Sequence, residues 1–191
     1  MTRRSVMVAA IGTVFGLAGM ASAAEKFELD SSHSTVLFKI KHLNTSWFYG
    51  RFTDIAGTLM VDAKKPDAST LEIKVKTESI QTDNEKRNAH LKSPDFFAAK
   101  QYPELTFKST SAKSVGDGAL EMKGDLTCHG VTKPLTVTLQ KVGEGKDPFG
   151  GYRAGYETKF NIKRSDFGMD YMPGGLGDEI EIIVSLEGVK K

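Results

Sequence analysis

Asp30, His33 and Ser34 lie within one pentapeptide, DSSHS, and they are the residue types of a nucleophilic hydrolase. Such an enzyme needs the three side chains to converge in space. If the segment is extended, His33 and Ser34 point to opposite faces of a strand. The chain also has no GxSxG nucleophile elbow. We therefore expect hydrogen bonding at the start of a strand here, and no catalytic residue.

The other side chains that could do chemistry are His42, His90 and His129, together with the single cysteine, Cys128. Metal sites usually pair their ligands at short spacing, as in HxxxH or CxxC, and neither pattern occurs. The sequence therefore predicts no metal site and no cofactor. Cys128 cannot form an internal disulfide because the chain has no second cysteine, and we expect it to serve as a small residue at the end of a strand.

Most of the chain alternates apolar and polar residues, which predicts strands with one buried face. In the first of these, Phe38 and Ile40 share a face with His42, while Lys39 and Lys41 point away. The alternation recurs at 55–61, 71–75, 105–107, 120–126, 135–139, 156–162 and 180–186. The glycine-rich segment 143–155 separates two of these stretches and is expected to be a hairpin turn.

Eight one-faced strands must either close into a barrel or stack as a sandwich. Eight is the number at which a closed barrel can hold side chains or one small ligand. We therefore predict an all-β fold, an eight-stranded antiparallel barrel. An outer-membrane barrel would carry aromatic girdles, whereas this chain has one Trp and strand faces dense with Lys and Glu. The expected barrel is soluble, with an apolar interior.

The first 23 residues have the pattern of a signal peptide: Arg3 and Arg4, an apolar run at 6–20, and the small-residue site 21–23. The run is shorter than the roughly 20 residues that span a bilayer. We expect cleavage after Ala23, one domain at 24–191, a periplasmic location and no stable membrane insertion. Without the two leader arginines the basic and acidic residues balance at 24 each, which leaves no electrostatic footprint for nucleic acid.

One segment, 82–97, breaks the strand pattern. Thr82 and Glu85 have the spacing of a capping box, and Ser93-Pro94 is typical of a second helical start. Phe96 and Phe97 follow and have no strand face to bury them. We therefore expect a short helical lid at one end of the barrel, with these two rings as its apolar plug.

Five stretches carry a resemblance to a known family: FELDSSHSTVLFKIKH, GRF, RNAHLKSPDFFAAKQYPELTFKST, GDLTCHGVTKPLTV and FNIKRSDFG. Together they resemble the YceI family of secreted bacterial lipid-binding proteins, over essentially the whole mature chain. The resemblance implies a lipocalin-like barrel whose apolar tunnel holds a long polyisoprenoid or related lipid, and it implies no catalysis. A long-chain lipid is therefore the expected partner, and a homodimer is left open.

Within that barrel, inward-facing apolar residues should line the tunnel, and polar residues at its mouth should meet a headgroup. The expected lining is Phe38, Ile40, Phe52, Ile73, Phe96, Phe97, Leu105, Phe107, Met122, Tyr156 and Phe160, and the expected mouth residues are His42, Arg87 and His90. Two alternatives stay open. A small extracytoplasmic enzyme would need at least two histidines in one pocket, and a filled barrel that serves as a structural or partner-binding domain would leave no cavity.

Overall fold

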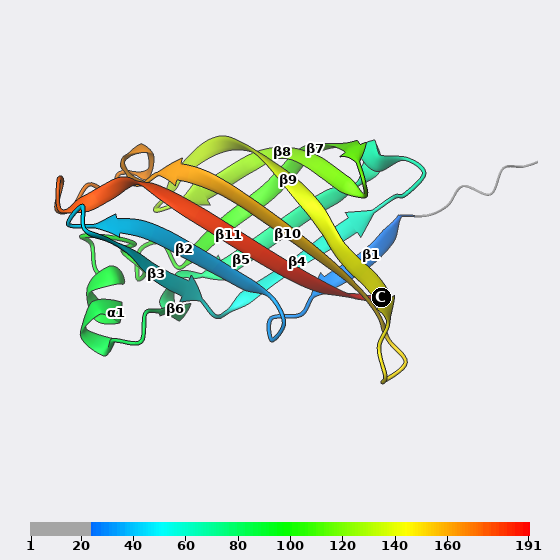
Figure 1. Ribbon diagram of the computed structural model, residues 1–191, viewed down its shortest axis with the longest axis horizontal. Coiled ribbons are helices and arrows are strands. Elements are labelled where there is room, and N and C mark those ends of the chain that lie inside the picture. The colour runs from blue at the N-terminus through cyan, green and yellow to red at the C-terminus, as the bar shows by residue number, and fades with distance from the viewer. Residues whose placement is uncertain (1–23) are drawn as a thin grey trace, which may run out of the picture.

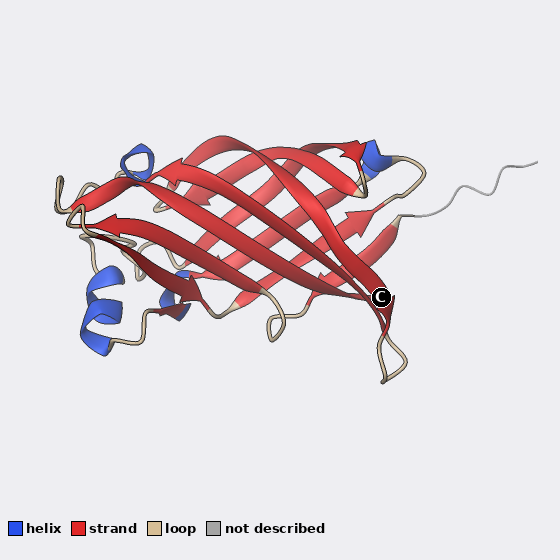
Figure 2. Cartoon of the chain, in the orientation of Figure 1, coloured by secondary structure: helices blue, strands red, loops and turns tan. Residues whose placement is uncertain are grey.

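The computed structural model describes residues 24–191, so the predicted signal peptide and its cleavage site lie outside the described residues. Among residues 24–191, no helix has the length and apolar character needed to cross a bilayer. The described chain forms one barrel-shaped sheet with a short helix at one end (Figures 1 and 2).

The sheet contains eleven strand segments in the described residues, all paired antiparallel. Their bounds are β1 (Glu25–Leu29), β2 (Thr35–His42), β3 (Ser46–Phe52), β4 (Ile55–Val61), β5 (Thr70–Lys76), β6 (Ile80–Gln81), β7 (Glu104–Gly116), β8 (Ala119–Cys128), β9 (Val131–Lys146), β10 (Tyr152–Lys163) and β11 (Leu176–Lys190). One α-helix, α1 (Glu85–Leu91), and three 3-10 turns, η1 (Pro66–Ala68), η2 (Thr77–Ser79) and η3 (Arg164–Phe167), complete the elements.

These eleven segments make eight strands, because β1 and β2 are the two halves of one bent strand, and so are β3 and β4, and β5 and β6. β1 pairs with β4 and β2 pairs with β3, while β11 pairs with both β1 and β2. In the same way β5 pairs with β4 and β6 pairs with β3. Each strand therefore pairs with its neighbour in the sequence, and β11 closes the ring onto the first strand. The predicted eight-stranded antiparallel barrel is confirmed.

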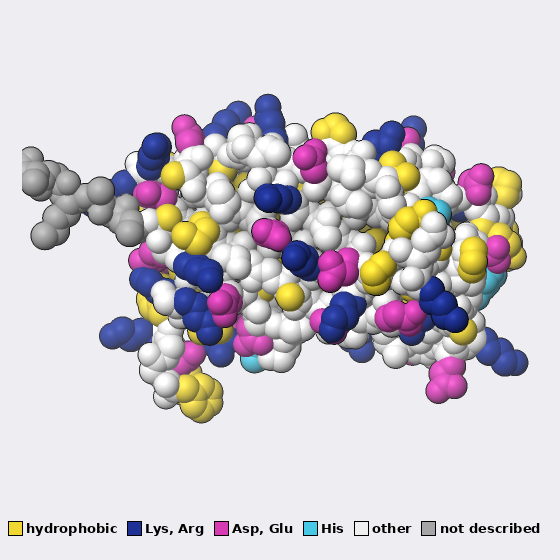
Figure 3. Space-filling model, turned by 180° about the vertical axis from the view of Figure 1, so that it is seen from behind, with side chains coloured by type: hydrophobic (Ala, Val, Ile, Leu, Met, Phe, Trp, Pro, Cys, Tyr) yellow, Lys and Arg dark blue, Asp and Glu magenta, His cyan; other side chains and the backbone are white. Residues whose placement is uncertain are grey.

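Alternation of burial along each strand places the apolar side chains inside the barrel. In β5, Leu71, Ile73 and Val75 are buried and the residues between them are exposed. The outer surface carries both signs of charge interspersed, as Figure 3 shows for one face. Some of these charges pair across strands, since Glu181 lies 3.6 Å from Lys39 and 3.2 Å from Lys159. The barrel thus has an apolar interior and a mixed-charge exterior.

The bend between β1 and β2 contains the DSSHS segment, which makes hydrogen bonds as predicted. Asp30 Oδ2 lies 2.9 Å from His33 Nδ1 and accepts a 2.8 Å bond from Arg153 Nη1. Arg153 Nη1 also donates to Glu187 Oε1 at 2.6 Å. Glu187 N donates to Ser34 Oγ at 3.0 Å, so the serine hydroxyl is committed to the backbone of β11. The network ties the first bend to β10 and β11.

The helix begins later than the sequence predicted. Its N-cap is Asn84, whose side chain accepts from Arg87 N at 3.0 Å, and not Thr82. Thr82 Oγ1 instead donates to Asn88 Oδ1 at 2.6 Å. Asp83, with φ of 56°, turns the chain between the two. Asn is at least as good an N-cap as Thr, so the capping box at Thr82 was wrong in detail while the helix itself is confirmed.

The second helical start expected at Ser93-Pro94 is a series of turns. Ser93 O accepts from both Phe96 N, at 3.1 Å, and Ala98 N, at 2.9 Å. Ala98 has φ of 44°, which ends any helical path there. The segment is therefore compact without being helical, and it folds back over the end of the barrel beside α1.

Candidate ligand cavity

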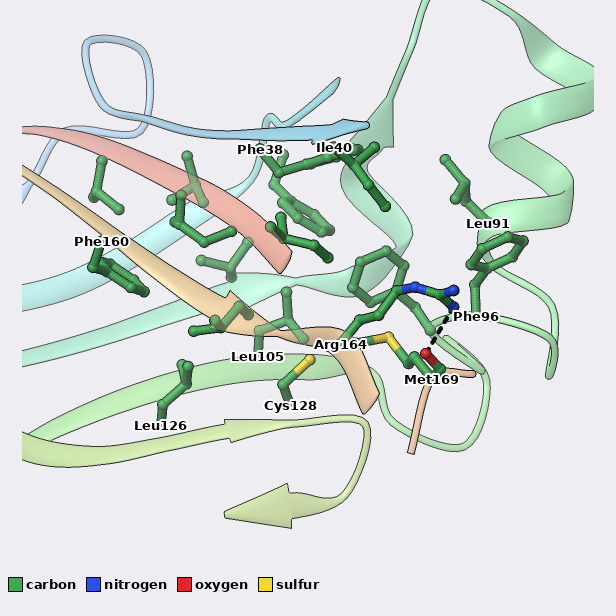
Figure 4. Close-up of a pocket in the computed structure, with 18 of the residues that line it drawn as sticks. Phe38, Ile40, Leu91, Phe96, Leu105, Leu126, Cys128, Phe160, Arg164 and Met169 are labelled. Atoms are coloured by element: carbon green, nitrogen blue, oxygen red, sulfur yellow. Dashed lines mark hydrogen bonds between the residues drawn. The ribbon is translucent and has the colours of Figure 1, made fainter. Parts of the chain in front are cut away.

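A cavity of about 660 Å³ occupies the half of the barrel nearest α1. Its wall comes from β2, β3, β5, β7, β8, β9, β10 and β11, and the lid segment and the β10–β11 connection border its mouth (Figure 4). No residue of β1 or β4 lines it. Phe27, Ile55 and Leu59, from those two strands, are buried and fill the other half of the barrel. The barrel is thus closed by packing at one end and hollow at the other.

Most residues expected to line a tunnel do line this cavity. They are Phe38, Ile40, Phe52, Ile73, Phe96, Phe97, Leu105, Phe107 and Phe160. Met122 and Tyr156 do not, which corrects the prediction for these two. Both are buried, but Met122 pairs with Ala112 of β7 and Tyr156 pairs with Leu186 of β11, and neither partner lines the cavity.

The two phenylalanines of the lid occupy different places. The Phe97 ring meets Phe52 edge-on, with centroids 5.5 Å apart, and packs against the main core. The Phe96 ring lies 5.0 Å from His90 and 5.1 Å from Tyr171, in a cluster of three aromatic rings at the mouth. Both rings line the cavity, so the lid contributes an inner ring and an outer ring.

The predicted mouth residues His42, Arg87 and His90 all line the cavity. Arg87 donates through Nε to Thr82 Oγ1 at 2.9 Å and through Nη2 to Thr82 O at 2.6 Å. Its guanidinium carbon lies 4.4 Å from the centre of the Phe48 ring. Through these contacts Arg87 connects the lid to β3, on the exposed side of the mouth.

His42 and His90 border the same cavity, which is the minimum that the enzyme alternative requires. His90 Nε2, however, lies 2.8 Å from a carboxylate oxygen of Asp95 on the outer side of the lid. No aspartate or glutamate of residues 24–191 lines the cavity. The carboxylate paired with His90 therefore stands outside the cavity wall.

A charged residue that the sequence reading missed lies at the inner side of the mouth. Arg164 is 4% exposed and lines the cavity, at the start of η3. A usable signal was present: Arg164 directly follows β10 and continues the alternation that points Tyr156, Phe160 and Ile162 inward. The adjacent Lys163 is exposed, so only the second residue of this basic pair turns inward.

Two further polar groups lie within the apolar wall. Cys128 ends β8, as predicted, and burial raises the pKa of its thiol to about 12. Thr158 is buried on β10, and its hydroxyl has no hydrogen-bond partner among the described residues. Both residues line the cavity. Neither is a nucleophile at neutral pH, because the thiol is protonated and no base contacts the hydroxyl.

Away from the cavity, Asp30, His33 and Glu187 place one ligand atom each within 4.8 Å of one another. Arg153 donates to both carboxylates of this group, and its guanidinium supplies the compensating positive charge. Hydrogen bonds from Ser32 and Arg153 hold the pKa of Asp30 well below its usual range. The group therefore works as a structural ion cluster.

Comparison with known proteins agrees with this architecture. The profile of the YceI-like domain matches residues 27–188. Protein YceI of Escherichia coli O17:K52:H18 is 40% identical over 190 residues, which cover 99% of each chain. The crystal structure of the Campylobacter jejuni YCEI protein is 31% identical and superposes with a TM-score of 0.71, over 79% of this chain and 90% of that one.

A polyisoprenoid binding domain from Saccharophagus degradans has the same fold, with a TM-score of 0.67 over 86% of this chain and 98% of that domain. Its sequence identity is 14%, so this likeness concerns the fold alone. The family match and the full-length relatives confirm the resemblance seen in the sequence. The chain belongs to the family of YceI-like domain proteins.

Proposed function

We propose that the protein binds an amphiphilic lipid with a long apolar chain, a polyisoprenoid or a related lipid, and shields that chain from water. The observation that carries the proposal is the cavity of about 660 Å³, apolar along its wall and polar at its mouth. Its size lies within the range of about 300–1,000 Å³ that ligand sites usually have. The described polyisoprenoid-binding function of the Saccharophagus degradans domain supports the same class of ligand.

The cavity volume sets the scale of the ligand. A methylene group is close in size to a water molecule, which takes up about 30 Å³, so the cavity accommodates on the order of 20 methylene-sized groups. Burial of each contributes about 0.8 kcal/mol before the entropy of binding is subtracted. This is ample for firm binding without any covalent or catalytic step. A longer chain would have to extend through the mouth or displace the lid.

Binding fits the molecule better than either alternative does. A filled barrel has no cavity, whereas this one is hollow over half its length. Two histidines, His42 and His90, border the cavity, but the nucleophiles beside them are a protonated thiol and a hydroxyl that no base contacts. Membership of the YceI-like family also favours a binding protein over an enzyme. We therefore propose sequestration or transport of the lipid, with no cofactor.

The predicted leader makes the periplasm the proposed location. If residues 1–23 are removed on export, the protein in an osmotic-shock fraction begins at Ala24. Its intact mass measures this directly. A chain that retains the leader, or one found only in the membrane fraction, would contradict export to the periplasm and would leave the cavity proposal standing.

Native mass spectrometry of freshly purified protein, followed by solvent extraction, tests the binding proposal. We expect lipid on the wild type and at least about tenfold less on Leu135→Trp, whose indole would occupy the cavity. Thr136→Trp is the matched control, because the next residue of β9 points outward and is exposed. A wild type without lipid that also takes up none when lipid is offered, or equal lipid on all three proteins, would refute the proposal.

A further inference from the structure

Arg164 has more hydrogen-bond donors than its protein partners use. Nε donates to Gly177 O at 3.0 Å, and Nη1 donates to Met169 O and Tyr171 O, both at 2.8 Å. Nη2 has a single contact, with Leu176 O at 3.5 Å, which is the outer limit for a hydrogen bond. A guanidinium carries five N–H groups, so Nη2 retains at least one that is free.

This spare donor lies where water is scarce. Arg164 is 4% exposed and borders the cavity at the level of Phe96 and Met169 (Figure 4). Buried donors almost always have a partner, because an unmet donor in an apolar environment is costly. The free N–H therefore indicates an acceptor that the cavity's occupant would supply.

The charge of Arg164 is also without a direct counter-ion. All four of its hydrogen-bond partners are backbone carbonyls. None of the ion pairs among residues 24–191 includes Arg164. Asp178 is the nearby carboxylate, and its pKa is lowered mainly by hydrogen bonds from Ser165 and to a smaller extent by the charge of Arg164. Its oxygens accept from Ser165 N at 3.0 Å and Ser165 Oγ at 2.8 Å. An acceptor oxygen would thus meet a positive charge that the protein neutralises only in part.

Arg87 differs in this respect. It is exposed, so its unused N–H groups are hydrated at no cost, and its Nε and Nη2 are already bound to Thr82. The two arginines therefore have different roles at the mouth. Arg87 holds the lid, and Arg164 has the capacity to hold a ligand.

We propose that Arg164 Nη2 binds the polar end of the cavity's ligand, and that this end is a hydrogen-bond-accepting oxygen group: a carbonyl, a carboxylate or a phosphate. The inference rests on the proposed function, since it assumes that an amphiphile occupies the cavity. It fixes the orientation of that amphiphile. The polar end lies beneath the aromatic cluster of His90, Phe96 and Tyr171, and the apolar chain runs inward toward Leu139.

Four probes that share a branched chain of about 20 carbons test the assignment: the carboxylic acid, the methyl ketone, the primary amine and the hydrocarbon. Each competes with a fluorescent apolar dye for delipidated protein, on the wild type and on Arg164→Met. We expect the variant to lose at least about tenfold in affinity for the acid and the ketone. The hydrocarbon should be unchanged within about threefold, and the amine should bind equally or better because a like charge is gone.

The direction of change separates a ligand contact from a structural role. If Arg164 only held the β10–β11 connection in place, all four probes would weaken together, and the proposal would be overturned. Equal affinities for all four on wild type and variant would also overturn it. Acid and ketone differ in charge, so a loss confined to the acid identifies an anionic end group and a loss of both identifies any acceptor oxygen. Both results support the assignment.

Two controls keep the test decisive. Lys163→Met removes the neighbouring cation, which is exposed, and should leave all four affinities unchanged. Arg164→Lys keeps the charge and should recover part of the affinity for the acid. If Arg164→Met does not fold, side-chain NMR of nitrogen-labelled arginine in the wild type decides: the Arg164 signals must shift more with the acid than with the hydrocarbon, and equal shifts overturn the proposal. A wild type that binds no probe overturns the proposed function as well.

Discussion

Phe96 and Phe97 are adjacent in the sequence, but they should stabilise different things. Phe97 meets Phe52 edge-on at 5.5 Å and packs against the main core. Phe96 packs at the mouth against His90 and Tyr171, outside the main core. We therefore expect Phe97→Ala to lower the free energy of unfolding, and Phe96→Ala to lower lipid retention with little effect on the fold.

The magnitudes follow from burial. Truncation of a fully buried Phe to Ala costs about 3–5 kcal/mol, and Phe97 is only partly buried, so we expect a loss of about 2–3 kcal/mol. Its aromatic contact with Phe52 accounts for about 0.5–1.5 kcal/mol of that loss. For Phe96 the expected stability change is below about 1 kcal/mol. If its ring covers the ligand, its removal exposes apolar surface worth about 1.5–3 kcal/mol, or roughly tenfold to a hundredfold in affinity.

Urea unfolding of delipidated protein measures the first quantity, and retention of a long-chain lipid during gel filtration measures the second. Tyr49→Ala is a suitable control, since this aromatic residue of β3 is 54% exposed on the outside of the barrel and should affect neither quantity. Equal losses of stability in Phe96→Ala and Phe97→Ala would show that the lid acts as one packed unit. Full lipid retention by Phe96→Ala would refute a plug at the mouth.

Two further substitutions and one chemical modification have definite expectations. Gly50→Ala would place a Cβ 2.1 Å from the ring of the facing phenylalanine and push that ring into the cavity; we expect about 1–3 kcal/mol lower stability and less bound lipid, and an unchanged melting temperature would contradict the close packing. Bonds from Ser32 and Arg153 hold the pKa of Asp30 below its ordinary value, so they stabilise the fold above about pH 4 and lose that effect as the pH falls. The stability lost in Arg153→Met, measured by urea unfolding, should therefore be largest at pH 7 and shrink toward pH 3, whereas a constant difference would argue against the linkage. The Cys128 thiol, with its pKa raised to about 12, should react with iodoacetamide at pH 8 about a thousandfold more slowly than a free thiol; rapid alkylation of folded protein, seen by intact mass, would show that the cavity opens to water.

The strands were predictable because a strand with one buried face alternates apolar and polar residues, and this alternation is visible in the sequence. All eight predicted stretches are strands in the structure. β3 was missed because aromatic residues occupy both of its faces: Trp47 and Tyr49 point outward, while Phe48 and Phe52 point inward, so no alternation is visible. The bends that divide three strands were also missed, because they depend on contacts between distant segments, such as the bonds from Arg153 to Asp30.

The alternation of side chains along a strand predicts which residues point inward, but it does not predict how far along the barrel axis each residue lies. Tyr156 and Phe160 point inward from β10 and Arg164 points inward just beyond its end, yet the first is packed in the filled half, the second lines the cavity and the third reaches its mouth. Their depths follow from register: Tyr156 pairs with Leu186 of β11, next to the segment that closes onto β1, whereas Arg164 lies beyond the last pair of β10. A single chain gives the face of each residue, but only the pairing of all eight strands shows where the packed interior ends and the hollow one begins.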